Sequence, residues 1–431
     1  MTRISPAPTS AAPASSLRPR PRPPFLSWPV SCREFYRALW LAMVLPLAWG
    51  IILFGVRPLS MLISALLAAT FTHVLLKRVL RWKNGRLLVY QHSIVSAIVL
   101  VSLAHPLWPT WTVTCAALVL PLILAVLGGP GRERVHIAIV AALAIQFGIM
   151  PWLPGMHAYA GGAGGRDHDD AILAKDRLLM GDIRNQRPFS VRLWPTSLDL
   201  AGNDAVQLTP PAVTAINAFD ELGRTLPGDA TGQAPRTAAE PLSAEQKSAA
   251  RNLLDNAFAF DLPGMDMLLL GAVPGRVGTV SLIGIVVGGL FLSYRHILRS
   301  RSTFLFLTIF ILASAMIAFP PTIILRAGLP TFVAVVSTFP AELFSLLAYL
   351  VLNSDAPFAA VFILALPGTE PLTPRGRRIF VIAAALLAAI LHRISPATPA
   401  ASLALVALMP AAPLFDYLFS RRSWLTSSRA A

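Results

Sequence analysis

Residues 36–54 read YRALWLAMVLPLAWGIILF, and a stretch of this length and composition decides the fold class. Because an α-helix rises about 1.5 Å per residue, roughly 20 apolar residues cross the roughly 30 Å hydrocarbon layer of a bilayer. Outward from this stretch, the chain has four more apolar runs before Pro154 and five after Met265. We therefore predict an all-α, polytopic membrane protein. The predicted spans are about ten in number and cover residues 36–54, 58–76, 91–107, 110–127, 135–153, 277–294, 303–319, 335–366, 379–393 and 400–419.

The eighth predicted span, residues 335–366, is unusually long and is interrupted by the sequence NSDAP at residues 353–357. Such a break predicts either two half-helices that meet in the bilayer or a re-entrant segment. Non-helical backbone at membrane depth persists only where protein or a water-filled cavity satisfies its polar groups. The two acidic residues near this break, Glu342 and Asp355, are therefore candidates either for a polar pathway or for interfacial positions.

The composition supports a membrane protein and excludes a nucleic-acid-binding one. Hydrophobic residues make up 55% and charged residues 13%, whereas a soluble domain has about 25% charged residues. The net charge of +15 is unevenly distributed, because residues 154–266 contain 10 Lys/Arg and 15 Asp/Glu. The excess of basic residues lies at span ends and in short loops, where the positive-inside rule places it.

Charge counting also predicts the orientation. With a cytoplasmic N-terminus, the inward-facing segments contain 22 Lys/Arg, and the short outward loops contain only Arg57, Arg326 and Arg393. Arg276 lies at the outer end of the sixth predicted span. This asymmetry places both termini in the cytoplasm and the polar insert outside it. Five spans on each side of the insert then run in opposite senses, an inverted architecture in which functional sites lie at the interface of the two units.

The predicted organisation has five parts. They are a disordered, basic, Pro-rich tail (1–34), a first five-helix membrane unit (35–153), an extracytoplasmic polar insert (154–266), a second five-helix membrane unit (267–420) and a cytoplasmic tail (421–431). The tail lacks the compact apolar core of a signal peptide, so the first span is expected to remain in the mature protein. Within the insert, residues 246–260 have helical periodicity and form either a partner-docking helix or a surface helix.

No catalytic motif of a soluble enzyme is present, and no metal is expected. Cys32 and Cys115 cannot form a CxxC site, and the run RDHDD at residues 166–170 is interpreted as a solvated charge cluster.

Two segments are more informative. Residues 270–281, LGAVPGRVGTVS, place glycines at the mouth of a span, where the backbone can approach either a ligand or another helix closely. Residues 366–378, LPGTEPLTPRGRR, form a proline-rich inner loop that ends in three arginines.

At these segments the chain resembles the RnfD family of membrane proteins from Rnf-type electron-transport complexes, which is related to the NqrB component of the sodium-translocating NADH:quinone reductase. Residues 271–281 resemble the family's GNIPGSIGETS, and residues 362–377 align without a gap with FMATDPVTSPVTPRGR. The ending PAAPLFD at residues 410–416 resembles NALVPLID. A weaker likeness begins at His92 and continues to the glycines after residue 127. The likeness covers the whole membrane part in order.

The resemblance implies a flavoprotein of a bacterial inner membrane, in which FMN is esterified through its phosphate to a threonine of the extracytoplasmic insert. Thr209-Pro210, preceded by Asp204, matches the end of the family's SGATPL motif. A second flavin is also possible within the family. The cofactor-binding residues that the resemblance suggests are Thr209, Gly275, Gly278, Thr279, Ser281, Pro367 and Thr369. The implied partners are membrane lipid, a cytoplasmic electron source and a protein with a periplasmic flavin-bearing domain, so the chain would catalyse only as part of a complex.

Several positions depart from the family pattern. The Ser-Gly-Ala before the threonine is absent, Thr279 replaces a glutamate, and Leu366 replaces an aspartate. The chain is therefore interpreted as a divergent member, and Thr209-Pro210 is either a flavin attachment site or a simple loop turn. The alternative function, from a different class, is a flavin-free transporter or channel-like protein on the same scaffold, because architecture alone does not establish redox chemistry.

Overall fold

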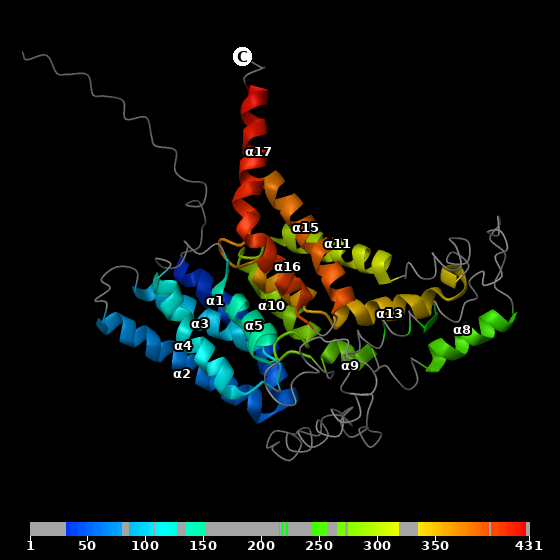
Figure 1. Cartoon of the computed structure of the whole chain (residues 1–431), viewed down its shortest axis with the longest axis horizontal. Coiled ribbons are helices and arrows are strands. Elements are labelled where there is room, and N and C mark those ends of the chain that lie inside the picture. The colour runs from blue at the N-terminus through cyan, green and yellow to red at the C-terminus, as the bar shows by residue number, and fades with distance from the viewer. Residues whose placement is uncertain are drawn as a thin grey trace, which may run out of the picture.

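The computed structural model describes residues 32–79, 86–106, 108–126, 135–150, 244–256, 265–271, 275–318, 335–395 and 398–427, together with residues 215, 218, 221 and 222. All regular secondary structure in these ranges is helical, as Figure 1 shows. This result confirms the all-α prediction.

The helices of the first half correspond to the first five predicted spans. They are α1 (Cys32–Phe54), α2 (Val56–Val79), α3 (Arg86–Leu103), α4 (Thr110–Val126) and α5 (Ile137–Ala144), which continues as the π-helix η2 (Ile145–Ile149). Pro46 in α1 and Pro121 in α4 lie inside their helices, as membrane helices tolerate.

The insert contains α8 (Ala244–Asn256), and the second half begins with the short helix α9 (Met265–Leu270). The remaining elements are α10 (Leu282–Tyr294), α11 (Ser300–Ala318), α13 (Pro340–Leu352), α14 (Ala356–Phe358) with the π-helix η9 (Ala359–Ile363), α15 (Pro374–Ile394), and α16 (Ala400–Leu408), which continues through the 3-10 helix η10 (Met409–Ala411) into α17 (Ala412–Ser427). Each of the ten predicted spans therefore contains a helix.

Four segments of the described chain are long and apolar enough to cross a membrane, and they are Glu34–Phe54, Val56–Arg78, Ser300–Ile317 and Ala400–Phe419. Shorter apolar helices cover Tyr90–Leu103, Thr110–Leu124, Ile137–Ile149 and Leu282–Tyr294. The chain is a multi-pass membrane protein.

The predicted break in the eighth span is present. Pro340–Leu352 and Ala356–Ile363 form a pair of apolar helices bent by 57°. At the break, the Ser354 hydroxyl donates to the Val351 carbonyl oxygen at 2.6 Å and accepts from the Ala356 amide at 3.2 Å. A side chain thus satisfies backbone groups that the interrupted helix would otherwise leave without partners.

The start of the sixth span differs from the prediction. The sequence predicted a span from residue 277, but α10 begins at Leu282, and residues 277–281 are not helical. Ser281 caps the helix, because its side chain accepts a hydrogen bond of 3.1 Å from the Gly284 amide. Residues 277 and 278 are turned away from a helical path because their amides bond to another segment of the chain, as described below.

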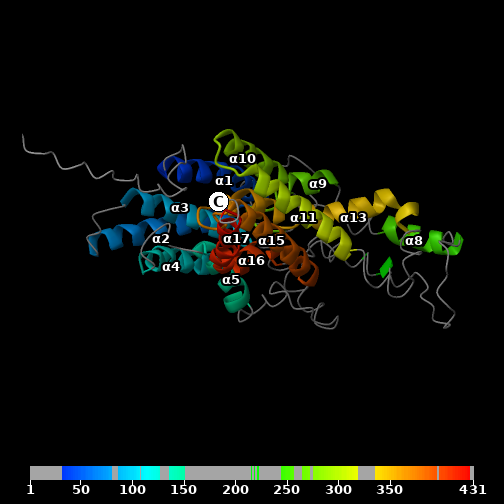
Figure 2. The same ribbon diagram turned by 90° about the horizontal axis from the view of Figure 1, so that it is seen from above.

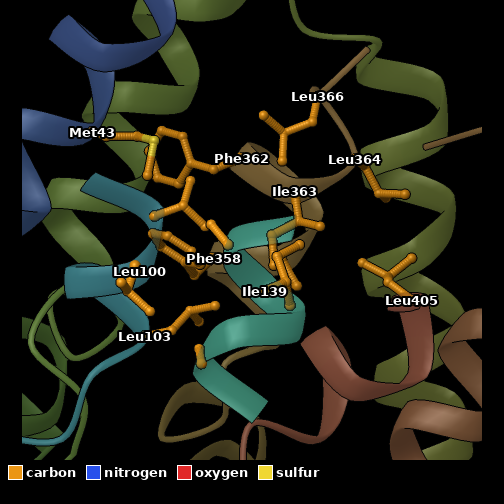
Figure 3. Close-up of a cluster of buried hydrophobic side chains, with 14 of the residues drawn as sticks. Met43, Leu100, Leu103, Ile139, Phe358, Phe362, Ile363, Leu364, Leu366 and Leu405 are labelled. Atoms are coloured by element: carbon orange, nitrogen blue, oxygen red, sulfur yellow. The ribbon is translucent and has the colours of Figure 1, made fainter. Parts of the chain in front are cut away.

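The main core lies where the two halves meet. α10 packs against α1, and α16 packs against α5. Figure 2 shows α10 beside α1, with α13 and α8 extending away from the first half. In Figure 3, Phe358 and Phe362 lie among Met43 of α1 and Leu100 of α3, and all four side chains are buried. Aromatic and branched side chains from both halves therefore form one continuous apolar interior.

A second, smaller core joins part of the insert to the membrane unit. Ala250 and Leu254 of α8 are buried in one cluster with Leu343 and Leu346 of α13. The helical periodicity noted in the insert therefore belongs to α8, and its apolar face packs within this chain. This packing favours the surface-helix alternative over a partner-docking helix.

Candidate functional site

The segment that connects α9 to α10, residues 275–281, is the interface loop between the two halves. Its residues donate hydrogen bonds to three successive carbonyl oxygens at the end of α3. The Gly278 amide donates to Ser102 at 2.9 Å, and the Val277 amide donates to Ala104 at 3.1 Å. The last carbonyls of a helix have no partner within that helix. The second half of the chain therefore caps a helix of the first half.

Arg276 completes this cap. Its guanidinium donates a hydrogen bond of 2.6 Å to the Leu103 carbonyl oxygen and lies 6.0 Å from the centre of the Trp108 ring. The residue is only 6% exposed. A buried guanidinium is stable where carbonyl oxygens, an aromatic face or a carboxylate compensate its charge, and the nearby carboxylate of Asp355 also acts on it electrostatically.

The glycines at this interface provide close contact between segments. A Cβ atom on Gly278 would lie 2.4 Å from the Ser102 Cβ, and one on Gly50 would lie 1.8 Å from the Val277 carbonyl oxygen. One on Gly284 would lie 2.8 Å from the Pro46 Cα. The space beside these glycines is therefore filled by the chain itself. The sequence left open whether these glycines approach a ligand or another helix. These contacts support close packing against another segment of the chain.

Asp355 acts as a helix cap across the break in the eighth span. Its carboxylate accepts hydrogen bonds from the Ala401 amide at 2.9 Å, the Ser402 amide at 2.8 Å and the Ser402 hydroxyl at 2.6 Å. These donors lie in the first turn of α16, where a negative charge is favourable. Glu342 lies in the first turn of α13 and is partly buried. Asp355 thus has a defined structural role beside the interface loop.

The second candidate segment, residues 366–378, is organised around a buried carboxylate. The side chain of Glu370 is 1% exposed and pairs through Oε2 with Arg299 at 2.8 Å and Arg377 at 3.1 Å. Asp416 of α17 accepts hydrogen bonds from the Leu372 amide at 3.0 Å and the Thr373 amide at 2.7 Å. Ion pairs and backbone hydrogen bonds therefore fix this loop to α11, α15 and α17.

The structure separates the two groups of predicted cofactor-binding residues. Gly275, Gly278, Thr279 and Ser281 lie just before α10. Pro367 and Thr369 lie in the loop that Glu370 ties to Arg299, beyond the other end of α10. Since α10 has 13 residues, the two groups are roughly 20 Å apart along its axis. Thr209 lies outside the described residues.

Several polar groups of the described candidates already have partners within the chain. The amides of Val277 and Gly278 are bonded to α3, and the oxygen of Ser281 accepts from Gly284. The Thr369 hydroxyl donates to the Leu366 carbonyl oxygen at 2.8 Å. A phosphate binds where free N–H donors converge, and these particular groups are already used within the chain. Within the described part of the chain, no group of three His, Cys, Asp or Glu side chains could hold a metal ion.

Two buried histidines were not singled out as candidates from the sequence. His92 of α3 and His136, just before α5, are 3% and 4% exposed, and their ring centres lie 5.3 Å apart. Ser96 lies 3.3 Å from the His92 Nδ1. The two histidines are 44 positions apart in the sequence, so no local pattern showed that they would be neighbours. The one available signal was that each lies beside an apolar run.

The comparison with known proteins agrees with this architecture. A family model described as the NQR2, RnfD, RnfE family matches residues 21–424. The match includes both halves and the insert between them. Among curated proteins, no sequence matches the chain.

Proposed function

Because the chain belongs to the NQR2, RnfD, RnfE family, we propose that it relays electrons through flavin as an integral membrane component of a multi-subunit redox complex. The observation that carries the proposal is the extent of the match, which spans residues 21–424 without omitting either half. A chain that matches the family over both halves has a framework that can position a redox group between partners.

We place the flavin in the insert. Thr209 is followed by Pro210 and preceded by Asp204, which resembles the family's attachment motif, and its hydroxyl would form the phosphoester with FMN. Bound FMN would supply reversible electron transfer through its ring system. In the described loops, the amides of Val277 and Gly278 and the hydroxyl of Thr369 are already bonded within the chain. The proposal therefore concerns the flavin at Thr209, and it assigns these loops no second flavin.

The role of the described residues in this function is to hold the two halves in one arrangement. Arg276 and the amides of residues 277 and 278 fix the interface loop to α3, and Asp355 fixes the broken eighth span to α16. Electron transfer depends on a defined spacing between redox groups. A rigid junction directly beside the insert would help to maintain that spacing.

The proposed setting is the inner membrane of a bacterium, with both termini in the cytoplasm and the insert outside. This orientation is supported by the 22 Lys/Arg on inward-facing segments. The proposed partners are a cytoplasmic electron source and a protein with a periplasmic flavin-bearing domain.

A second candidate function is a flavin-free transporter or channel-like protein. The observation that favours it is the 57° bend in the eighth span, since broken helices form substrate sites in many transporters. Against it, both oxygens of Asp355 at the break are occupied by hydrogen bonds from α16.

In-gel flavin fluorescence of the purified full-length chain separates these functions. The wild type and a Thr214→Ala control, five residues further along the insert, are expected to fluoresce after denaturing electrophoresis. Thr209→Ala is expected to lose the signal. Fluorescence that survives Thr209→Ala eliminates this attachment site. If neither the denatured chain nor the native one contains flavin, the transporter is the better account.

A further inference from the structure

Six arginines gather where α11 and α15 begin, and together they form what we term the arginine face. They are Arg295, Arg299, Arg301, Arg375, Arg377 and Arg378. α11 packs against α15, and the carboxylate of Glu370 pairs with an arginine just before α11 and with one in the first turn of α15. The starts of the two helices therefore lie side by side. The carboxylates of Glu370 and Asp416 lie close to this face.

The pairing with Glu370 orients two guanidinium groups without covering them. Arg299 and Arg377 remain 38% and 26% exposed, whereas the side chain of Glu370 is 1% exposed. Arg377 also donates to the carbonyl oxygens of Pro371 at 3.2 Å and Leu372 at 3.3 Å, so both the loop and Glu370 hold this planar guanidinium in place. The positive-inside rule accounts for basic residues in a cytoplasmic loop but not for any fixed orientation of their side chains. Here a buried carboxylate also sets the direction of the charged groups.

Exposed apolar side chains continue the arginine face along the same helices. Arg301 precedes Phe304 by three residues, and Phe304 is 70% exposed. Arg375 precedes Ile379 by four residues, and Ile379 is 41% exposed. Residues three or four apart share one face of a helix. Each helix therefore presents a guanidinium and, one turn further along, an apolar side chain.

We propose that the arginine face binds the phosphate headgroup of an anionic phospholipid, with its acyl chains along the exposed apolar residues of α11 and α15. Arginine recognises phosphate oxygens through paired hydrogen bonds, and basic clusters at the cytoplasmic ends of membrane helices attract anionic headgroups. An acidic protein segment would satisfy the charge equally well. It would not explain why exposed apolar side chains follow the arginines on the same helix faces, so the lipid is the better fit.

The test is native mass spectrometry of the full-length chain in detergent with added phosphatidylglycerol or phosphatidylcholine. The wild type is expected to retain phosphatidylglycerol preferentially. Arg301→Gln combined with Arg375→Gln should weaken that retention by about tenfold or more, since each basic residue near the surface contributes to the attraction. Lys247→Gln combined with Arg251→Gln makes the same charge change on exposed positions of α8 and should have no effect.

Several outcomes would overturn the proposal. Equal retention of the two lipids by the wild type does so, as does an equal loss in the α8 control. Competition by glycerol phosphate as strong as that by the lipid would indicate a free-phosphate site. Competition by an added acidic peptide as strong as that by the lipid would indicate a protein-docking surface. If the glutamine variant does not fold, a salt titration of the wild type decides the matter, because phosphatidylglycerol retention must fall as salt rises.

Discussion

The guanidinium of Arg276 donates a hydrogen bond of 2.6 Å to the main-chain oxygen of Leu103, 173 residues earlier in the chain. This bond joins the loop after the insert to the end of a helix that precedes the insert. Together with the amides of Val277 and Gly278, it caps the end of α3. The junction of the two halves is therefore fixed on the side where the insert leaves and re-enters the helical part of the chain.

The first prediction concerns this bond. Replacing Arg276 with Met leaves the Leu103 carbonyl without its donor, and a lost buried partner costs about 1–3 kcal/mol. Thermal unfolding of the purified protein should show a lower midpoint. Arg251→Met is the control, because that side chain is 74% exposed on α8 and surface changes stay within about 0.5 kcal/mol. Equal midpoints for the Arg276 variant and wild type would exclude a stabilising role for the cap.

The second prediction concerns the fit of Gly278 against α3. Gly278→Ala should destabilise the junction, because the new Cβ would lie 2.4 Å from the Cβ of Ser102 and overpacking costs about 1–3 kcal/mol. Adding Ser102→Gly removes the contacts with the Ser102 Cβ and Oγ but leaves its Cα at 2.8 Å, so it should recover part of the loss. Unfolding midpoints of the two single variants and the double variant measure the coupling. Strict additivity of the two changes would contradict the contact.

The third prediction concerns Asp355. Asp355→Leu removes three hydrogen bonds to the start of α16, so the amides of Ala401 and Ser402 should exchange with solvent deuterium faster than in the wild type. Hydrogen–deuterium exchange over residues 400–408 provides the measurement. Glu342→Leu is the control, since Glu342 lies in a different helix. Unchanged exchange in α16 would show that the cap does not protect it.

The fourth prediction concerns Glu370. Glu370→Gln removes the charge that pairs with Arg299 and Arg377 and leaves two guanidinium groups close together. The loop before α15 should loosen, which limited proteolysis between residues 364 and 373 would detect. Asp255→Asn interrupts an exposed pair with Arg251 at 3.9 Å and should not alter the digestion, because exposed pairs contribute about 0–1 kcal/mol. Identical digestion of the Glu370 variant and wild type would argue against a structural ion pair.

The sequence was sufficient to predict the spans because hydrophobic length is a local property. All ten predicted spans contain a helix, and the break at residues 353–357 was visible in the polar sequence NSDAP. The start of the sixth span was wrong by five residues. Residues 277–281 are not helical because the amides there bond to Ser102 and Ala104, and no local pattern indicates which distant carbonyl will accept a given amide.

The candidate site was predictable only in part for the same reason. The glycines before α10 were noticed, but the contact of Gly50 with Val277 depends on how two distant segments pack. Glu370 could have been noticed as the one acid in a loop that ends in three arginines. Its pairing with Arg299 joins residues 71 positions apart and required the structure.

The central claim, a flavin covalently bound in the insert, is tested most directly by the intact mass of the purified full-length chain. The account predicts that the wild type and Thr214→Ala are heavier than their sequences by one FMN less one water. It also predicts that Thr209→Ala has the mass of its sequence alone. An unmodified wild-type chain from cells that supply the flavin transferase, or a modified Thr209→Ala chain, would contradict it.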